Sequence, residues 1–99
     1  MAEIKVFKEK FEPVQYKIID LENNEKIITQ ATPHTLDVQD KIEKIIYDTQ
    51  ITNGEKIWKQ MVLVFGTDEQ TKSVEFWKKF QLDFISQILE DFMATSKKK

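Results

Sequence analysis

The 99-residue chain contains no cysteine and no arginine, and each absence excludes a class of chemistry. Without cysteine there is no disulfide, no thiolate nucleophile and no cysteine-ligated zinc or iron–sulfur site. Without arginine the chain lacks the bidentate fork that dominates contacts to phosphate and guanine. The 15 lysines are interleaved with 17 acidic residues, so that no basic face of useful size forms. We therefore expect no nucleic-acid partner.

Glycine and proline occur only twice each, and apolar runs are short. With 11% aromatic residues, this composition excludes a disordered or low-complexity chain. The N-terminus lacks the basic and apolar regions of a signal peptide, and no apolar run reaches the length of a membrane span. These features predict a cytoplasmic protein with no membrane partner. The length predicts one domain, 1–99, with a thin core and no deep substrate pocket.

Between residues 3 and 31, apolar and polar side chains alternate as they do in strands. The stretch ENNE at 22–25 predicts a turn, because asparagine tolerates a positive φ. Pro13 lies where a first strand connects to a second, and there it removes only an edge donor. Three short antiparallel strands are therefore predicted. The alternating set is Ile4, Val6, Val14, Tyr16, Ile18, Ile27 and Thr29.

Beyond Pro33 the apolar period changes from two to that of a helix. Three helices are predicted, at about 35–50, 55–65 and 71–94, followed by a frayed tail at 95–99. The fold class is thus α+β, a small N-terminal three-stranded antiparallel meander followed by three helices, the last one long. The first two helices are expected to place Ile45 and Phe65 in the core.

Local signals mark where these helices begin and end. Asn53 and Gly54 break the chain before the second helix, and Gly66 ends that helix. The third helix has two possible starts: a capping box over residues 67–70, or Ser73. The sequence does not decide between them.

The third predicted helix carries apolar side chains over well over half of its circumference. Its unbroken polar strip is narrow and consists of Lys79, Asp83, Ser86, Gln87 and Glu90. A helix that packs on a small core needs a narrower apolar stripe. The surplus predicts that part of this face contacts another chain, including a second copy, so we expect a homo-oligomer.

Four aromatic residues of this helix form the candidate partner-binding site: Phe76, Trp77, Phe80 and Phe84. The three phenylalanines form a ridge at one edge of the apolar sector, because they recur every fourth residue. The centre of the sector holds Trp77, Ile85, Ile88 and Phe92. Two interpretations stay open: the ridge is ordinary core, or it contacts an amphipathic helix of another chain.

No catalytic or metal constellation stands out. His34 is the only histidine, and no activated nucleophile is placed beside it, so a junction or capping role is expected. Residues 20–31 begin like a calcium loop but lack the glycine and glutamate at its sixth and twelfth positions. Gly54 and Gly66 stand alone, so there is no phosphate loop. We expect a chain that is not an enzyme and takes no cofactor.

The order of elements and one local motif carry a family resemblance. A strand hairpin precedes two helices, the second ends in MVLVFG at 61–66, and a threonine-led turn leads into a final helix. In this the chain resembles the small tail assembly chaperones of long-tailed phages that infect Gram-positive bacteria. The resemblance implies a non-enzymatic protein that coats the tape measure protein during tail assembly. It also implies a longer frameshifted form that recruits tail tube subunits.

Two hypotheses from different classes follow. The first is this assembly chaperone, which self-associates and shields the apolar helical surface of a client. The second is a small phage or mobile-element inhibitor that binds and blocks a host enzyme. A gene between those of the tail tube and the tape measure protein favours the first, and an isolated accessory gene favours the second.

Overall fold

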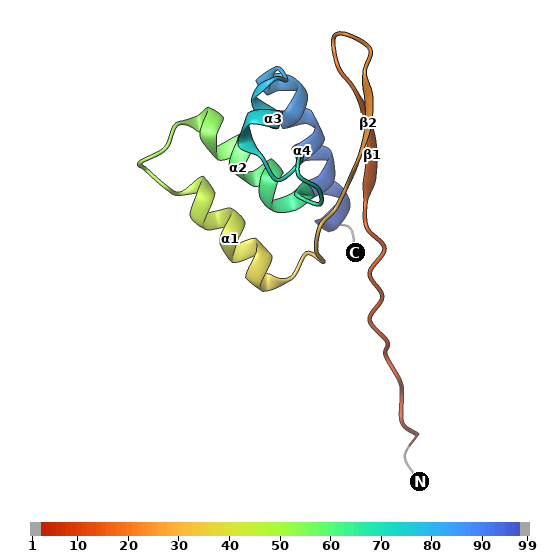
Figure 1. The fold of residues 1–99 in the computed structure, drawn as a ribbon. Coiled ribbons are helices and arrows are strands. Elements are labelled where there is room, and N and C mark those ends of the chain that lie inside the picture. The colour runs from red at the N-terminus through yellow and green to blue at the C-terminus, as the bar shows by residue number, and fades with distance from the viewer. Residues whose placement is uncertain (1–2, 98–99) are drawn as a thin grey trace.

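The computed structural model describes residues 3–97, with the side chains of residues 96 and 97 left aside, and confirms the α+β class. A two-stranded antiparallel hairpin stands beside a body of four helices (Figure 1). In chain order the elements are β1 (Gln15–Ile19), β2 (Glu25–Thr29), α1 (Leu36–Ile46), α2 (Asn53–Phe65), α3 (Val74–Lys78) and α4 (Leu82–Lys97).

The hairpin forms as the alternation predicts. Tyr16 pairs with Ile28, and Ile18 with Lys26, so these residues share the face that packs on the helices. The Asp20 carboxylate accepts hydrogen bonds from the backbone N–H groups of Glu22 and Asn24, which closes the turn. Asn23 has a φ of 66°, so the predicted asparagine turn is confirmed.

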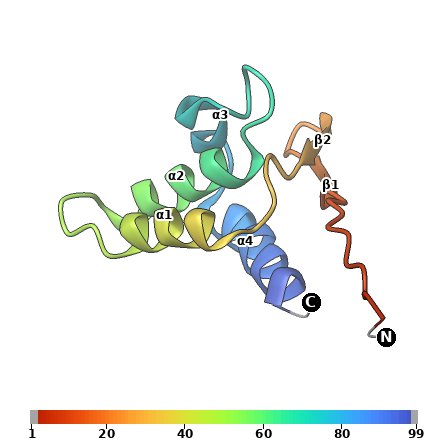
Figure 2. The same ribbon diagram turned by 90° about the horizontal axis from the view of Figure 1, so that it is seen from below.

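The prediction of three strands is wrong, because residues 3–13 form no strand. They form an extended arm that continues from the base of β1 away from the helical body (Figures 1 and 2). A strand needs a partner edge, and the alternation of Ile4 and Val6 supplies none within the chain. Pro13 and the charged residues just before it contain no tight-turn signal that would reverse the arm onto β1.

The first predicted helix ends earlier than expected, at Ile46 and not near residue 50. There the Asp48 carboxylate accepts a hydrogen bond from the Gln50 N–H, and this local turn competes with a further helical turn. The second helix begins at Asn53, two residues before the predicted start. Its N-cap is Thr52, whose hydroxyl accepts a hydrogen bond from the Glu55 N–H.

The prediction of one long third helix is also wrong, because the structure divides this segment into α3 and α4 at residues 79–81. Its start is Ser73, since residues 67–70 form a separate turn. In one straight helix the wide apolar arc would leave many side chains in water. The turn brings Trp77 of α3 and Ile85 of α4 into one core. The predicted frayed tail is helical as far as residue 97, and residues 98–99 lie outside the described part.

The core lies where the inner face of the hairpin meets α1, α2, α3 and α4. Phe65 is at its centre, with ring centroids 5.9 Å from Tyr16, 6.5 Å from Trp77 and 5.5 Å from Phe92. Phe65 is fully buried, as predicted, whereas Ile45 is only half-buried and α1 buries Ile42 instead. The fully or nearly buried apolar residues are Ile18, Ile28, Ile42, Met61, Val64, Phe65, Trp77, Ile85, Leu89 and Phe92.

Candidate protein-binding groove

A groove lies between the tip of the hairpin and the turn that joins α3 to α4. It consists of two adjoining hollows of about 300 and 310 Å³, which share Asp20, Asn24, Lys79 and Phe80. The first also has Phe84 and the apolar tip residues Ile19 and Leu21 in its walls, and the second has Phe76. The groove therefore has aromatic rings next to Lys79 and glutamines on its helical side and is mixed in character at the hairpin.

The three phenylalanines of the predicted ridge line this groove as one row, in which Phe76 meets Phe80 edge to face and Phe80 stacks on Phe84. The ring centroid of Phe80 is 5.4 Å from that of Phe76 and 5.6 Å from that of Phe84. All three side chains are half-buried. They pack on the core with one side and leave the other side available, so the core interpretation holds in part and the contact with another chain stays a prediction.

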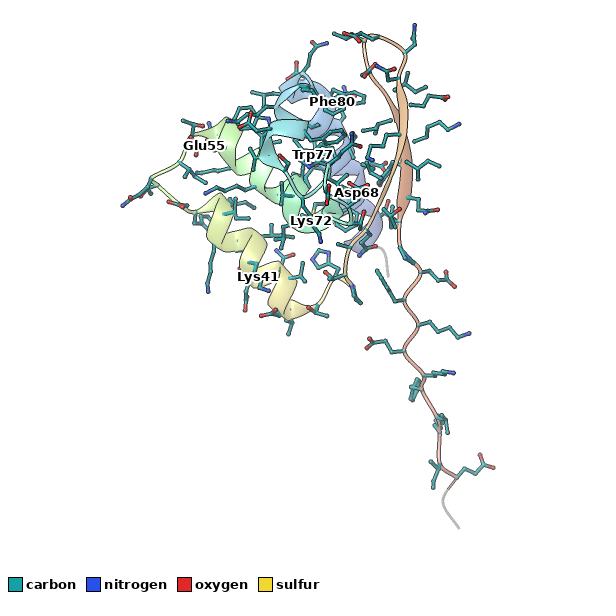
Figure 3. The ribbon with its side chains drawn as sticks, viewed as in Figure 1. Lys41, Glu55, Asp68, Lys72, Trp77 and Phe80 are labelled. Atoms are coloured by element: carbon teal, nitrogen blue, oxygen red, sulfur yellow. The ribbon has the colours of Figure 1, made fainter. Side chains whose placement is uncertain are left out.

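Trp77, the fourth predicted site residue, lies beneath this ridge in the core. Its side chain is fully buried, its ring meets that of Phe76 edge to face at 4.9 Å, and Figure 3 labels it within the helical body. The indole Nε1–H donates a hydrogen bond of 2.9 Å to the Thr71 carbonyl oxygen. Trp77 therefore supports the ridge from inside and offers no surface to a partner in this conformation.

Charged side chains of both signs surround the groove. The ammonium groups of Lys26 and Lys79 lie 5.8 and 5.1 Å from the Phe76 ring centroid, within the range of a cation–π contact. Hydrogen bonds from the backbone N–H groups of the hairpin turn, Asn24 first, lower the pKa of Asp20. The rim therefore carries the Asp20 carboxylate together with the ammonium groups of Lys26 and Lys79, so its charges are of both signs.

Thr71 holds the turn before α3 and is a residue that sequence reasoning missed. Its hydroxyl accepts hydrogen bonds from the backbone N–H groups of Thr67 and Asp68, and its own N–H donates to the Asp68 carboxylate at 2.8 Å. This hydrogen bond and the Lys26 ammonium lower the pKa of Asp68 to about 2. Thr71 is completely buried, so this turn is a fixed support for Trp77 and, through it, for the ridge.

Leu21, at the tip of the hairpin, was missed as well. Its side chain is 85% exposed and lines the groove opposite the phenylalanines. The signal was present in the sequence, because a leucine inside an otherwise polar turn has no core to enter. Only the arrangement in space shows that it faces Phe80.

His34 lies in the junction between β2 and α1, as predicted. Its ring stacks on Phe92 at 6.1 Å between centroids, and its Nε2 is 2.7 Å from the Gln39 side-chain oxygen. Among the described side chains, up to residue 95, no hydroxyl forms a hydrogen bond with this ring. The arrangement packs α1 against α4 and contains no nucleophile–base pair among the described side chains.

The described side chains include no group of three histidine, aspartate or glutamate residues placed to hold a metal ion. None of the helices in residues 3–97 is both long enough and apolar enough to cross a bilayer. Comparison with family models, with curated proteins and with solved structures finds no match for this chain. Residues 3–97 thus form an α+β fold with an aromatic-walled groove on its surface.

Proposed function

We propose that this chain is a non-enzymatic protein-interaction protein, a phage tail assembly chaperone that acts in the host cytoplasm. It self-associates, binds the tape measure protein during virion assembly and meets tail tube subunits there. The observation that carries the proposal is the groove between the hairpin tip and the α3–α4 turn. Its wall of three half-buried phenylalanines is built for an apolar anchor of another chain.

The groove suits the apolar stripe of an amphipathic helix better than it suits a small substrate. It lies at the surface between the hairpin and the helices, and Phe80 lies in both of its hollows. Aromatic rings on a helix-binding wall accept leucine or phenylalanine anchors spaced three and four residues apart. The tape measure protein is the client that the family resemblance implies.

The order of elements adds support. The hairpin, the helix that ends at Gly66 and the threonine-led turn stand in the sequence that the resemblance requires. The final helix departs from the resemblance, because it is divided into α3 and α4. The divided helix also removes the wide apolar arc as an argument for self-association, which therefore needs a surface of its own.

The deciding experiment combines gene position with a binding titration. The gene should lie between those of the tail tube and the tape measure protein, and segments of that tape measure protein should bind the full chain in calorimetry. Leu21→Ser should weaken binding without unfolding the protein, because Leu21 lines the groove outside the core. Tyr47→Ser, an exposed residue beyond the groove, is the matched control and should leave binding unchanged.

Two outcomes would overturn the proposal. One is a gene in an isolated accessory operon together with no binding to any tape measure segment. This result would favour the second hypothesis, an inhibitor that binds a host enzyme. The other is equal loss of binding in Leu21→Ser and Tyr47→Ser, which would show that the groove is not the client site.

A further inference from the structure

The extended arm, residues 3–13, leaves its apolar side chains in water. Ile4, Val6 and Phe7 are 89%, 85% and 91% exposed. Within the described chain, no residue of the arm forms a hydrogen bond or an ion pair. An extended segment in which Ile4, Val6 and Phe7 alternate or combine with charged residues, and whose backbone is unpaired, can serve as a strand for another sheet.

The same chain contains a free sheet edge that matches this strand. The hydrogen-bonded pairs of the hairpin include Val14 with Gln30 and Asp20 with Asn24, so the residues between alternate in role. The N–H and C=O groups of Gln15, Lys17 and Ile19 therefore point outward from β1. No other backbone group in residues 3–97 bonds to them.

We propose that the arm of one copy adds as a third strand to the free edge of β1 in a second copy. The backbone groups of the arm supply the ladder bonds that the edge lacks, and the exposed Phe7 gains an apolar neighbour in the same step. The inference rests on the self-association part of the proposed function and names its surface. It does not depend on the groove or on the identity of a client.

Charge complementarity favours this partner and sets an orientation. The hairpin tip, residues 19–25, carries three acidic residues and no lysine, whereas residues 4–8 of the arm carry Lys5 and Lys8 and no acid. When the arm runs antiparallel to β1, its N-terminal half lies beside the tip of the other copy. The two lysines then lie near Asp20 and Glu22 of that copy.

One register pairs an apolar residue with an apolar one and an acid with a lysine at two successive positions of the outer face. With Phe7 opposite Ile19, Glu9 is opposite Lys17 on the same outer face. Ile19 is 49% exposed in the single chain and Ile27, its diagonal neighbour on β2, is 59% exposed. Phe7 would extend this pair into a continuous apolar strip across three strands.

The pairing is reciprocal, because the arm and β1 follow each other along the same extended stretch of chain. Each copy can therefore give its arm and accept the arm of the other. A two-fold axis near Pro13 places the arm of each copy on β1 of the other and closes the assembly as a dimer. Proline has no N–H, so the ladder is interrupted at the axis and consists of two separate segments. The edge of β2 is less suited, since the chain just beyond it is tied to α2 by the hydrogen bond from Ala31 to Val64.

The first test is sedimentation of the full chain at tens of micromolar. The wild-type chain should form dimers, and Phe7→Ser should raise the dimer dissociation constant at least about tenfold, since one phenylalanine leaves a buried position at each arm. Tyr47→Ser is the matched control, because Tyr47 is also an exposed aromatic residue, at 76%, but lies outside the arm and the edge. It should leave the constant unchanged.

The second test uses the absence of cysteine, which makes every introduced thiol unique. Phe7→Cys and Ile19→Cys chains, mixed and oxidised, should form a disulfide between copies, since opposite residues in an antiparallel pair lie within its reach. Lys41→Cys on α1 replaces Ile19→Cys in the control mixture and should not be linked. Circular dichroism should show that all variants are folded, because each side chain is exposed.

A monomeric wild-type chain at these concentrations would overturn the inference. So would equal dissociation constants for Phe7→Ser and Tyr47→Ser, or equal cross-linking to residues 19 and 41. These results are separable from the fate of the proposed function. A dimer that depends on Phe7 but binds no tape measure segment would support the arm exchange and contradict the chaperone proposal.

Discussion

The Tyr16 hydroxyl of β1 donates a hydrogen bond of 2.5 Å to the carboxylate of Asp91 in α4, 75 residues further along the chain. The Tyr16 ring also meets Phe65 of α2 edge to face, at 5.9 Å between centroids. One side chain thus joins the hairpin to two helices. Since a two-stranded hairpin is marginally stable by itself, contacts of this kind hold it against the body and keep the groove in shape.

Replacing Tyr16 with phenylalanine should cost about 1 kcal/mol in the free energy of unfolding, because the ring contact stays and only the hydrogen bond is lost. Burial first, and then Asp91, raise the pKa of Tyr16 from 10.0 to about 12. The stabilisation is therefore complete below pH 10 and is lost as the pH rises through 12. Urea unfolding at about pH 8 and about pH 11 should show a smaller difference in Tyr16→Phe than in the parent. An equal difference would contradict the prediction.

Asp68 should contribute to stability in the opposite pH range. Its pKa is lowered from 3.8 to about 2, so its contribution is present above pH 3.8 and is lost as the pH falls through 2. Asp68→Asn keeps an acceptor for the Thr71 N–H but loses the charge that faces Lys26. Because the pair is partly exposed, the cost at neutral pH should stay below about 1 kcal/mol.

Acid titration followed by circular dichroism measures the effect of Asp68. The parent should lose more stability between about pH 4 and about pH 2 than Asp68→Asn does. Asp37→Asn is the control, because Asp37 pairs with Lys41 on the exposed face of α1. If Asp37→Asn changes the acid transition as much as Asp68→Asn, the Lys26–Asp68 pair has no special role.

Glycine should be required at position 66 because the Val62 carbonyl oxygen lies too close to leave room for a Cβ. The backbone dihedral angles of residue 66 do not by themselves require glycine. A Cβ at this position would lie 2.3 Å from the Val62 carbonyl oxygen, while φ is an ordinary −76°. Gly66→Ala should therefore cost more than about 1 kcal/mol. Gly54→Ala is the control, since a Cβ there meets only the movable Trp58 ring, at 3.3 Å. Denaturant midpoints that shift equally would show that the backbone at residue 66 relaxes.

Local patterns predicted the hairpin, the helices α1 and α2 and the burial of Phe65, because the apolar period, helix caps and turn residues act over a few positions. The missing first strand shows their limit. Ile4 and Val6 alternate properly, but a strand also needs an edge, and no local pattern says where one lies. The divided final helix has a similar cause, since only the shared core makes a turn after Trp77 favourable.

Only one wall of the groove was predicted from the sequence. The phenylalanine ridge follows from spacing alone, and the structure leaves it half-buried. Its opposite wall was not predicted, because the hairpin tip and α3 are separated by some fifty residues and meet only in the folded chain. Trp77 was included in the partner surface although spacing puts it at the centre of the apolar sector, and its complete burial agrees with that central position.

Core and client surface should separate when Phe80→Ala is compared with Phe92→Ala. Phe92 is 2% exposed and contacts Phe65, so its truncation should cost about 3 to 5 kcal/mol of stability. Phe80 is half-buried at the centre of the ridge, so its truncation should cost clearly less. Chemical denaturation of both variants measures this difference.

For binding, Phe80→Ala should have the larger effect and Phe92→Ala the smaller one, when both are compared as folded proteins. Phe80→Ala should weaken binding of a tape measure segment by about 2 kcal/mol, as expected for an anchor in a well-packed contact. Phe92→Ala, measured at a temperature where it is folded, should bind nearly as the parent does, because its ring lies in the core and outside the groove. If Phe80→Ala instead unfolds the chain as severely as Phe92→Ala, the ridge is ordinary core. Leu21→Ser would then be the remaining probe of the groove, since the leucine side chain lies outside the core.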